Sequence, residues 1–350
     1  MTILKTWIVK AENDRLEEKD MKKLGEIIAA GGLVAFPTET VYGLGASAFD
    51  ENAASKIYAA KGRPSDNPLI VHISDYSELD TVVREIPKGA ELLFSHFSPG
   101  PLTVIMKKAD TLAKTVTAGL DTVAVRIPSN PVARALIKAS GVPIAAPSAN
   151  ISGKPSPTTA KHVIADMDGK IDAVIDGADC DVGVESTIID MTGDKPVMLR
   201  PGGITYSEIK KLLPDIEIDR HITEAVTVKD KPKCPGMKYK HYAPDADVTV
   251  VEGKLSEIRE KIRQLIEDER KNQNRRIGVL AYDGGEYDAD YIIYSGKDNR
   301  SYAHNLFRDL REFDENGADI VFAEFVYDVD YGLAVKNRLY KSAGNKVIHL

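Results

Sequence analysis

Short apolar runs alternate with amphipathic segments along the first half of the chain. Residues 20–28 place apolar side chains at helical spacing, and Gly31-Gly32 predicts the end of that helix. The apolar run 33–36 is typical of a buried strand, and the glycine-containing segment 37–45 is predicted to be a loop. A second helix is predicted over residues 51–60. Strands interleaved with helices favour an α/β layer architecture.

Further apolar runs predict the remaining strands of this region. Most of them are rich in β-branched or other aliphatic residues, as strands usually are. Strands are expected at 69–73, 102–106, 122–126, 142–146, 173–175, 187–189 and 197–199. Because the connections between these runs vary in length, the pattern leaves the order of the strands in the sheet open.

The regular pattern weakens after Leu213. Residues 214–245 contain several prolines, scattered lysines and aspartates and little periodicity, which is typical of a linker. A new alternation follows, with strands expected at 248–251, 277–281, 291–294 and 320–322 and helices at 255–267, 306–313 and 333–342. We therefore predict an α/β domain over 1–213, a linker or lid over 214–245 and a smaller three-layer, Rossmann-like α/β domain over 246–350.

The composition argues against several classes of protein. The chain has 46 basic and 53 acidic residues, a net charge of −7, which argues against a surface that coats nucleic acid. Cys180 and Cys234 are in no paired-ligand spacing, so we expect neither a disulfide framework nor a structural zinc site. No apolar run reaches the roughly 18 residues of a membrane-spanning helix, and the first ten residues form no signal-peptide core. We expect a cytoplasmic protein.

Familiar nucleotide and hydrolase signatures are absent. The sequence contains no G-x-x-x-x-G-K-[ST], no H-E-x-x-H and no G-x-S-x-G. Gly43-Leu-Gly45 lacks the third glycine of a dinucleotide-binding fingerprint. A nucleotide site in this chain would therefore be of a less common type.

The loop 37–45 is the first of four polar segments that follow predicted elements. It comes after a buried strand, where open α/β sheets place ligands, and it offers the hydroxyls of Thr38, Thr40 and Tyr42. A tight strand-to-helix connection would explain the same residues without any ligand. Both interpretations stay open at this point.

The second polar segment ends the second predicted helix. Lys61 and Arg63 lie on either side of a glycine, and Asn67 follows. A guanidinium and an ammonium in this arrangement suit a polyphosphate, but the helix dipole also favours cations at a helix C-terminus. His72, in the apolar strand that follows, has the ordinary interpretation of a hydrogen-bonded core histidine.

The third and fourth segments also flank predicted strands. A dense run of hydroxyls and amides, including Ser148 and Asn150, can bind phosphate oxygens or form a turn and a helix cap. Ser186 begins a predicted strand, and Arg200 ends one before a glycine turn. An isolated arginine in such a position is usually a surface residue.

Residues 235–244 differ from the rest of the predicted linker. Two tyrosines, two lysines and a histidine cluster there, whereas linkers favour small and polar residues. Clustered aromatic residues indicate that this segment docks onto a binding partner or a ligand site. A linker packed on a domain surface is the alternative.

Several of these segments together resemble a known family. Pro37-Thr-Glu-Thr-Val-Tyr-Gly-Leu, Lys61-x-Arg63, Ser148-x-Asn150 and Arg200-Pro-Gly resemble the YrdC-type domain of threonylcarbamoyl-AMP synthases. The segment 235–244 and the α/β domain after it resemble the longer, two-domain branch of this family. The resemblance covers essentially the whole chain, and the motifs agree in order and spacing.

The resemblance implies a fold and an activity. The fold is a twisted, open YrdC-like sheet with a positively charged cavity. The enzyme is a nucleotidyltransferase that joins L-threonine, bicarbonate or CO2, and ATP into L-threonylcarbamoyl-adenylate and releases pyrophosphate. Mg2+ is expected on the ATP phosphates, with few ligands from the protein. Partner proteins, the tRNA-modifying threonylcarbamoyl transferases, then modify N6 of the adenosine beside the anticodon of ANN-decoding tRNAs (t6A), and any contact of this chain with tRNA is expected to be weak.

The resemblance also implies roles residue by residue. Lys61 and Arg63 are the expected catalytic cations, and no residue stands out as a general base. The implied ATP contacts are Arg63, Asn67, Thr122, Ser148, Asn150, Ser156, Arg200 and a tyrosine of the lid, Tyr242 or Tyr239. The implied threonine contacts are Thr40, His72, Arg126 and Ser186, of which Arg126 suits the carboxylate. No metal ligand from the protein is implied.

Two other functions compete with this interpretation. An RNA-binding module would use a basic cavity without catalysis, although the net charge argues against it. A carbamoyl-adenylate maturation factor shares a related domain but also needs cysteine-rich zinc modules, which two isolated cysteines cannot supply. Release of pyrophosphate that depends on threonine would separate the synthase from both.

Overall fold

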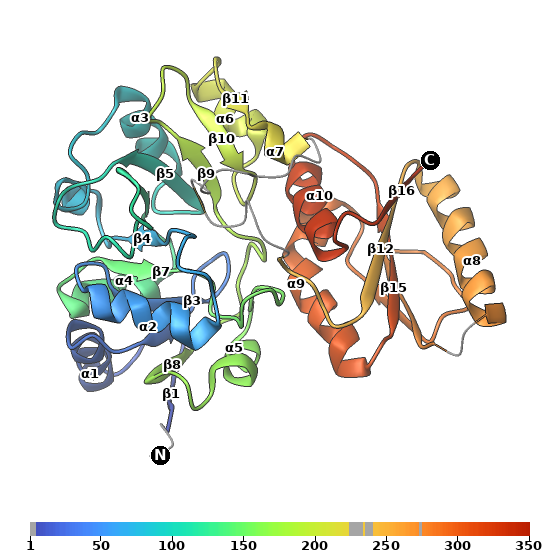
Figure 1. The fold of residues 1–350 in the computed structure, drawn as a ribbon, viewed down its shortest axis with the longest axis horizontal. Coiled ribbons are helices and arrows are strands. Elements are labelled where there is room, and N and C mark those ends of the chain that lie inside the picture. The colour runs from blue at the N-terminus through green and yellow to red at the C-terminus, as the bar shows by residue number, and fades with distance from the viewer. Residues whose placement is uncertain (1–4, 224–233, 235–240, 273–274) are drawn as a thin grey trace. The chain divides into compact units, whose positions relative to one another are not determined.

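The computed structural model of the protein describes residues 5–223, 234, 241–272 and 275–350. The chain forms two compact units, each built around its own sheet (Figure 1). The first unit comprises Met1–Ser152 and Ser156–Lys238, and the second comprises Gly153–Pro155 and Tyr239–Leu350. Three residues from the middle of the first unit's sequence therefore belong to the second unit.

The first unit contains a mixed sheet of eleven described strands. Their order is β1-β8-β2-β3-β7-β4-β6-β5-β9-β10-β11. The strands are β1 (Trp7–Lys10), β2 (Val34–Phe36), β3 (Gly43–Ser47), β4 (Ile70–His72), β5 (Leu102–Lys107), β6 (Thr122–Arg126), β7 (Ile144–Ala146), β8 (Ala173–Asp176), β9 (Thr187–Asp190), β10 (Val197–Arg200) and β11 (Glu217–Ile218). Every strand predicted for this region is present, and the mixed α/β class is confirmed.

Helices connect these strands. They are α1 (Glu18–Ala29), α2 (Glu51–Lys61), the 3-10 helix η1 (Tyr76–Thr81), α3 (Lys88–Phe97), α4 (Pro131–Ser140), α5 (Ala160–Met167), α6 (Tyr206–Leu212) and α7 (Arg220–Thr223). The two helices predicted from periodicity, α1 and α2, have nearly the predicted bounds.

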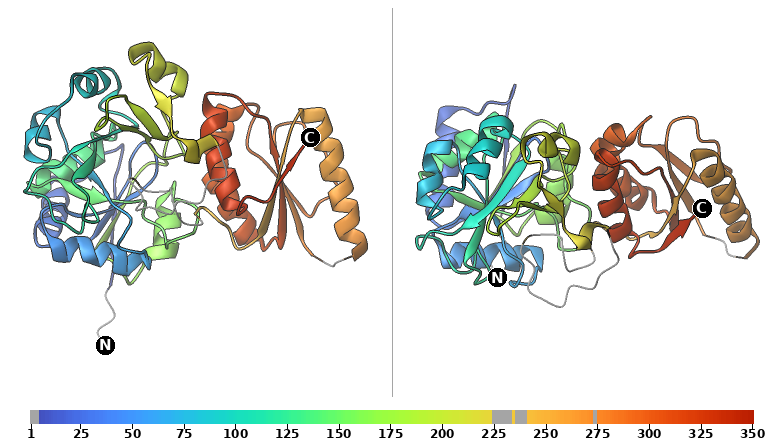
Figure 2. Two further views of the ribbon diagram at one scale, coloured as in Figure 1. Left: turned by 45° about the horizontal axis from the view of Figure 1, so that its top comes forward. Right: turned by 90° about the horizontal axis from the view of Figure 1, so that it is seen from above.

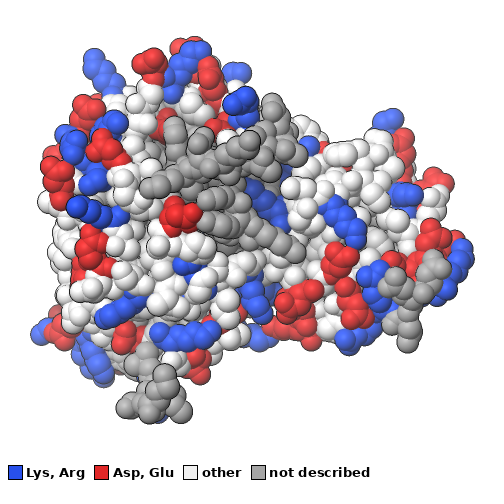
Figure 3. All heavy atoms as spheres, viewed as in Figure 1, with Lys and Arg blue, Asp and Glu red and all other residues white. Residues whose placement is uncertain are grey.

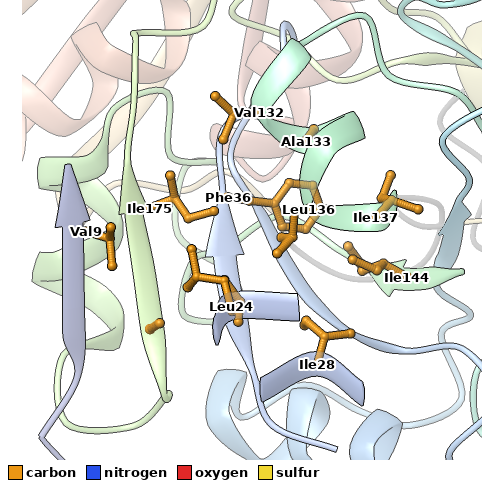
Figure 4. Packing of buried hydrophobic residues seen from close by; sticks show 13 residues of the cluster. Val9, Leu24, Ile28, Phe36, Val132, Ala133, Leu136, Ile137, Ile144 and Ile175 are labelled. Carbon is orange, nitrogen blue, oxygen red and sulfur yellow. The ribbon is translucent and has the colours of Figure 1, made fainter. Parts of the chain in front are cut away.

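One hydrophobic core of this unit lies between α1, α4 and the strands β1, β8 and β2. Leu24 and Ile28 of α1 and Leu136 of α4 pack with Phe36 of β2 (Figure 4). The two helices approach closely because α1 has a glycine at the contact: a Cβ on Gly25 would lie 2.4 Å from a carbonyl oxygen of α4. The apolar face predicted for the first helix is therefore its buried face.

The segment 37–45 is not the strand-to-helix loop that the sequence suggests. Its last three residues belong to β3, which pairs antiparallel with β2, so only residues 37–42 form the connection. Gly45 allows this pairing, since a Cβ there would lie 2.7 Å from the side chain of Ile144 and 2.8 Å from that of Phe36. Small residues here indicate close packing in a central strand rather than a turn.

In the middle of the sheet, strand pairing places several predicted site residues next to one another. His72 at the end of β4 pairs with Arg126 at the end of β6, because these strands run parallel. An isolated bridge pairs Gly43 with Ser148, just beyond β7. Helix α2 stops at Lys61 because Gly62 adopts a left-handed conformation with φ of 62°.

The second unit is a three-layer α/β domain, as predicted. Its five described strands are all parallel in the order β14-β13-β15-β12-β16, with α8 on one face and α9 and α10 on the other (Figures 1 and 2). The elements are β12 (Asp247–Glu252), α8 (Leu255–Asn272), β13 (Ile277–Ala281), β14 (Tyr291–Tyr294), α9 (Asn299–Asn316), β15 (Ile320–Phe325), α10 (Tyr331–Ser342) and β16 (Val347–His349).

The segment Gly153–Pro155 is held within the second unit by hydrogen bonds. Arg311 of α9 donates to the carbonyl of Pro155 from Nε at 3.1 Å and from Nη2 at 2.6 Å. The backbone N–H of Ala243 donates to the carbonyl of Gly153 at 2.9 Å. These contacts explain why three residues leave the first unit.

The predicted linker 214–245 is only partly described. Its first ten residues contain β11, which pairs with β10, and α7, so they continue the first unit rather than begin a linker. Residues 224–233 and 235–240, with Tyr239 among them, lie outside the described residues. Within the described parts of the chain, no helix is long and apolar enough to cross a membrane.

Candidate active site

Among the described residues of the first unit, three cations are buried almost completely. The exposed fractions of Lys61, Arg126 and Arg200 are 2%, 4% and 5%. Lysine and arginine are rarely buried unless they are paired, so each needs a partner in the fold. The partners identify the site, because they come from the polar segments that the sequence singles out.

The connection 37–42 joins two other segments of the site. The backbone N–H of Tyr42 donates to the carbonyl of Pro157, and the carbonyl of Tyr42 accepts from the N–H of Ala149, both at 2.8 Å. The Thr38 hydroxyl lies 2.9 Å from the Thr40 hydroxyl and donates to the Val41 carbonyl. These bonds fix the connection beside the hydroxyl-rich run that follows β7.

Glu39 extends from the same connection to Arg126. Arg126 Nη2 donates to Glu39 Oε1 at 2.7 Å, and the other carboxylate oxygen accepts from the N–H of Ser129 at 3.1 Å. The carbonyl of Glu39 accepts from the N–H of Val182 at 2.8 Å. The strand end that carries Arg126 is thereby tied to the connection 37–42 and to the segment before Ser186.

His72 is a buried neutral imidazole. Its exposed fraction is 4%, and its Nδ1 lies 3.1 Å from the carbonyl oxygen of Ile70. Burial, reinforced by the nearby charge of Arg126, lowers the pKa of His72 to about 3. The side chain is therefore a hydrogen-bonding group and not a source of charge at neutral pH.

This shift predicts a specific acid sensitivity. A histidine with a folded pKa near 3 and an ordinary value of 6.5 contributes stability that is complete above pH 6.5 and declines as the pH falls toward 3. We expect a loss of roughly 2–3 kcal/mol in the free energy of unfolding at pH 4.5 from this residue alone. Urea unfolding of the wild type and His72→Asn at pH 7.5 and 4.5 measures it. An unchanged difference between the two proteins at both pH values would show that the imidazole is not the cause.

Lys61 holds the run that follows β7. Its ammonium donates to the carbonyl oxygens of Ser148 and Asn150, each at 2.5 Å. The Ser148 hydroxyl donates to Asn150 Oδ1, also at 2.5 Å. The predicted residues Lys61, Ser148 and Asn150 therefore form one connected group at the end of α2.

Arg63 and Asn67 lie next to this group. Arg63 Nη2 donates weakly to the carbonyls of Asn67 and Pro68, at 3.4 and 3.3 Å. Thr122 is the first residue of β6. The strands β4 and β6 run parallel with Ile70 beside Ala124, so Thr122 lies level with Pro68. Thr122 is consequently at the Arg63 end of these strands, roughly 13 Å along β6 from Arg126.

The side-chain amide of Asn67 is buried beside Arg63. The residue is 1% exposed, and among the described residues neither its Nδ2 nor its Oδ1 has a hydrogen-bond partner. Buried amides are nearly always satisfied, because an unpaired one costs free energy. An amide in this condition is suited to a ligand that supplies both a donor and an acceptor.

We expect Asn67→Ala to weaken ATP binding without destabilising the ligand-free protein. The variant removes an amide that has no partner to lose, whereas a bound ATP loses about one hydrogen bond, equivalent to roughly a 10-fold weaker affinity. Calorimetric titration with a non-hydrolysable ATP analogue and thermal melting test both parts. Asn52→Ala, at an exposed position of α2, is the control. Unaltered affinity would remove Asn67 from the site.

A third group joins β9, β10 and β5. Arg200 Nη2 donates to the Ser186 hydroxyl and its Nε to the Ser186 carbonyl, both at 3.1 Å. The Ser186 hydroxyl is also 2.7 Å from the Thr103 hydroxyl. The turn after Arg200 packs against this strand so closely that a Cβ on Gly202 would lie 2.1 Å from the carbonyl oxygen of Glu185.

The structure connects several of the predicted site residues, and one belongs to the second unit. Ser156 joins the third group, since its hydroxyl donates to Glu185 Oε1 at 2.9 Å. Tyr242, predicted to reach ATP, is 5% exposed in the second unit, where its ring packs 5.1 Å from that of Phe307 and lies under the guanidinium of Arg338. Its contact with ATP stays a prediction.

Sequence reasoning missed three buried polar residues of the site: Glu39, Thr103 and Glu185. Each contacts a predicted residue, but the partner is far away in the sequence or on another strand. The sequence offered one sign of these residues: each is a polar residue in a segment of otherwise small or apolar residues. That signal does not name the partner.

The arrangement suits chemistry on anionic substrates. Buried cations, hydroxyls and an unpaired amide can bind carboxylate and phosphate oxygens in a water-poor environment, where such contacts are strong. The Ser186 hydroxyl has Thr103 and Arg200 as its described partners, neither of which is a base. The fold and site are typical of α/β enzymes that position reactants for group transfer.

Charged side chains of both signs are mixed on the face of the molecule that Figure 3 shows. On the face seen in Figure 3, lysines and arginines are interspersed with aspartates and glutamates on both units. Together with the net charge of −7, this distribution gives no support to an RNA-binding module.

Two family models match adjacent parts of the chain. The Sua5, YciO and YrdC family model, described as telomere recombination, matches residues 26–202, and the model described as the C-terminal domain of threonylcarbamoyl-AMP synthase matches residues 204–344. The chain belongs to the threonylcarbamoyl-AMP synthase family, in its two-domain form. The resemblance found in the sequence is confirmed.

Relatives match over nearly the whole chain. Threonylcarbamoyl-AMP synthase from Pyrococcus abyssi is 50% identical over 96% of this chain and 97% of its own length, and that from Bacillus subtilis is 47% identical over 98% and 99%. A crystal structure of Pyrococcus abyssi Sua5 complexed with L-threonine has a TM-score of 0.93 at 48% identity and covers 99% of both chains.

Proposed function

We propose that this enzyme synthesises L-threonylcarbamoyl-adenylate from L-threonine, bicarbonate or CO2, and ATP, with release of pyrophosphate. The observation that carries the proposal is the linkage of buried cations by one connection. Residues 37–42 bond to Arg126 and to the runs around Ser148 and Ser156, so groups suited to an amino acid and to a nucleotide belong to one continuous network. Membership of the synthase family supports the same reaction.

The threonine end would be formed by Arg126, Thr40, His72 and Ser186. Arg126 is the group for the carboxylate, since a guanidinium can bind both oxygens. His72, with its pKa lowered to about 3, offers a neutral hydrogen bond and does not repel the amino group. The deprotonated amine attacks carbon dioxide, and loss of one N–H proton to solvent gives the carbamate.

The ATP end would be formed by Arg63, Asn67 and Arg200. A carbamate oxygen attacks the α-phosphorus, a new O–P bond forms, and the bond to the β-phosphate oxygen breaks to release pyrophosphate. Negative charge grows on the leaving oxygen, where Arg63 and Arg200 stabilise it. Lys61 keeps the Ser148–Asn150 run in place through its two carbonyl bonds. Positioning of this kind supplies much of the rate in reactions without a covalent enzyme intermediate.

Mg2+ would enter as part of the ATP substrate. The groups named for the ATP end, Arg63, Asn67 and Arg200, are two cations and an amide, which suit phosphate oxygens better than a metal ion. Among the described residues no three His, Cys, Asp or Glu side chains are grouped for metal binding. The phosphates would therefore supply most of the ligands for the ion, as is usual for Mg2+.

The product would be consumed by a second protein. A mixed anhydride of a carbamate and a phosphate is labile, so we infer delivery to threonylcarbamoyl transferase proteins that modify N6 of the adenosine beside the anticodon of ANN-decoding tRNAs. Contact of this chain with tRNA would be weak at most, given its charge. A cytoplasmic location is part of the same proposal, and a sequence with only two cysteines suits it.

The test is a turnover assay with the purified full chain. The protein is incubated with MgATP, labelled bicarbonate and L-threonine, and pyrophosphate and labelled adenylate are measured. We expect pyrophosphate release only when threonine is present. Binding of tRNA without any turnover would instead favour the RNA-binding module, and release that ignores threonine would exclude the synthase.

A further inference from the structure

The ion pair between Glu39 and Arg126 is the most enclosed one described in the first unit. The exposed fractions of the two side chains are 7% and 5%, and the charged atoms are 2.7 Å apart. Taking two charges out of water costs free energy that their attraction recovers only with good geometry and further hydrogen bonds. The Ser129 N–H supplies one such bond to the second carboxylate oxygen.

The backbone around Glu39 is also fixed. Its carbonyl accepts from the N–H of Val182, and Thr38, one residue earlier, closes a turn by accepting from the N–H of Thr40 at 3.2 Å. A carboxylate held from both sides has few alternative positions. The guanidinium that it binds is therefore held as well.

In the described ion pair only one nitrogen of the guanidinium donates to Glu39. Arg126 Nη2 donates to Glu39, whereas Nε is buried and has no hydrogen-bond partner in the described parts of the chain. An unsatisfied, buried N–H on a fixed cation is suited to a carboxylate oxygen. The salt bridge thus leaves a donor available instead of occupying the whole side chain.

We propose that Glu39 is a positioning residue for threonine: it holds Arg126 through Nη2 so that the remaining donors of the guanidinium meet the substrate carboxylate. This inference rests on the proposed function, which places threonine at Arg126. Glu39 touches neither the reacting nitrogen nor ATP in this scheme, and its effect is carried entirely by Arg126.

Two opposing effects follow from removing the negative charge of Glu39. The net positive charge at Arg126 rises, which would attract a carboxylate more strongly. The arginine also loses the partner that orients it, and a buried cation without its partner moves toward other acceptors. We expect the loss of orientation to outweigh the gain in charge, so that threonine binds more weakly. An arginine that is no longer held must be ordered each time the substrate binds, and this ordering costs conformational entropy.

The experiment compares Glu39→Gln with the wild type and with Glu51→Gln. Glutamine keeps the volume of Glu39 and an oxygen for Ser129 but removes the charge. Glu51 also accepts backbone N–H bonds, from Lys114 and Thr115, away from the site. We expect Glu39→Gln to raise the KM for threonine about 10-fold or more, with the KM for ATP unchanged. The control should change neither value.

A double-mutant cycle separates positioning from a general structural role. In an Arg126→Ala background, Glu39→Gln should have no further effect on the KM for threonine. Equal effects of Glu39→Gln on both substrates, or an effect that persists without Arg126, would overturn the proposal. A lower KM for threonine would overturn it too, because charge and not orientation would then dominate.

Failure of the proposed function gives a different result. Calorimetric binding of L-threonine to the full chain needs no turnover, so the Glu39 effect is also measured as a weaker affinity. Wild-type protein that binds threonine but releases no pyrophosphate would reject the synthase assignment and leave the Glu39 inference testable. Wild-type protein that does not bind threonine at all would reject both.

Discussion

Replacing Lys61 by alanine should lower kcat by about 100-fold or more while the protein stays folded. The ammonium is the shared donor for the carbonyls of Ser148 and Asn150, and both carbonyls lose it together. The run that carries the Ser148 hydroxyl then shifts, and displacements of about 1 Å are enough to cost large factors in rate. Steady-state pyrophosphate release measures the change.

Lys56→Ala is the matched control for this variant. Lys56 lies on the same helix, α2, and its ammonium also donates to a backbone carbonyl, that of Gly31 at 2.6 Å. Lys56 precedes Lys61 by five residues, which is roughly 140° around the helix, and its bond is to the residues that follow α1. The kcat of this variant should therefore stay within a factor of about two. Equal losses in the two variants would mean that α2 stability, and not the site, explains the effect.

Replacing Arg200 by alanine should have the second large effect, about 100-fold or more in kcat/KM. Arg200 is the cation that we expect to bind the phosphate chain, and its two bonds to Ser186 also fix a group expected to hold threonine. The KM values for both substrates should therefore rise together. Arg200→Lys keeps the charge but cannot reproduce both bonds, so it should recover only part of the loss.

Arg134→Ala provides the comparison for Arg200. Arg134 is half-buried in the first unit and donates from Nε to the carbonyl of Ser74 at 2.9 Å, so it has the same kind of bond without a predicted role. Its removal should change stability only. Full activity of Arg200→Ala in the same assay would contradict the position assigned to the phosphates.

Much of the fold follows from local pattern. Residues 51–60 were predicted as a helix, and α2 spans Glu51–Lys61 because Asp50 caps its first turn and Gly62 ends it. The run 277–281 matches β13 because a continuous apolar run in a parallel sheet is buried on both faces. In both cases the residues that set the boundary are next to it in the sequence.

The errors have a different physical origin. β3 is made of glycine, alanine, leucine and serine, which have no common strand propensity. Its pairing with β2 requires a glycine at position 45, which lies between Phe36 and Ile144. The residues 214–223 look irregular in sequence, yet β11 pairs with β10. Both elements depend on neighbours that the local pattern does not contain.

The site was predictable only where several motifs could be combined. Arg126 and Arg200, taken singly, resemble ordinary arginines, and it is the family resemblance that points to them. Glu39 was missed because its partner is 87 positions away, and a glutamate in a loop is usually solvent-exposed. Long-range ion pairs of this kind become visible only in three dimensions.

The assignment of Gly153–Pro155 to the second unit limits how the protein can be divided. A cut anywhere between residues 223 and 241 would break the chain but would leave three residues of the N-terminal fragment bound to α9 through Arg311. An N-terminal half produced by itself would carry this tripeptide without its support, between Asn150 and Ser156. Truncation is therefore a poor guide to what the C-terminal half contributes, because it also removes the Arg311 bonds to the Pro155 carbonyl.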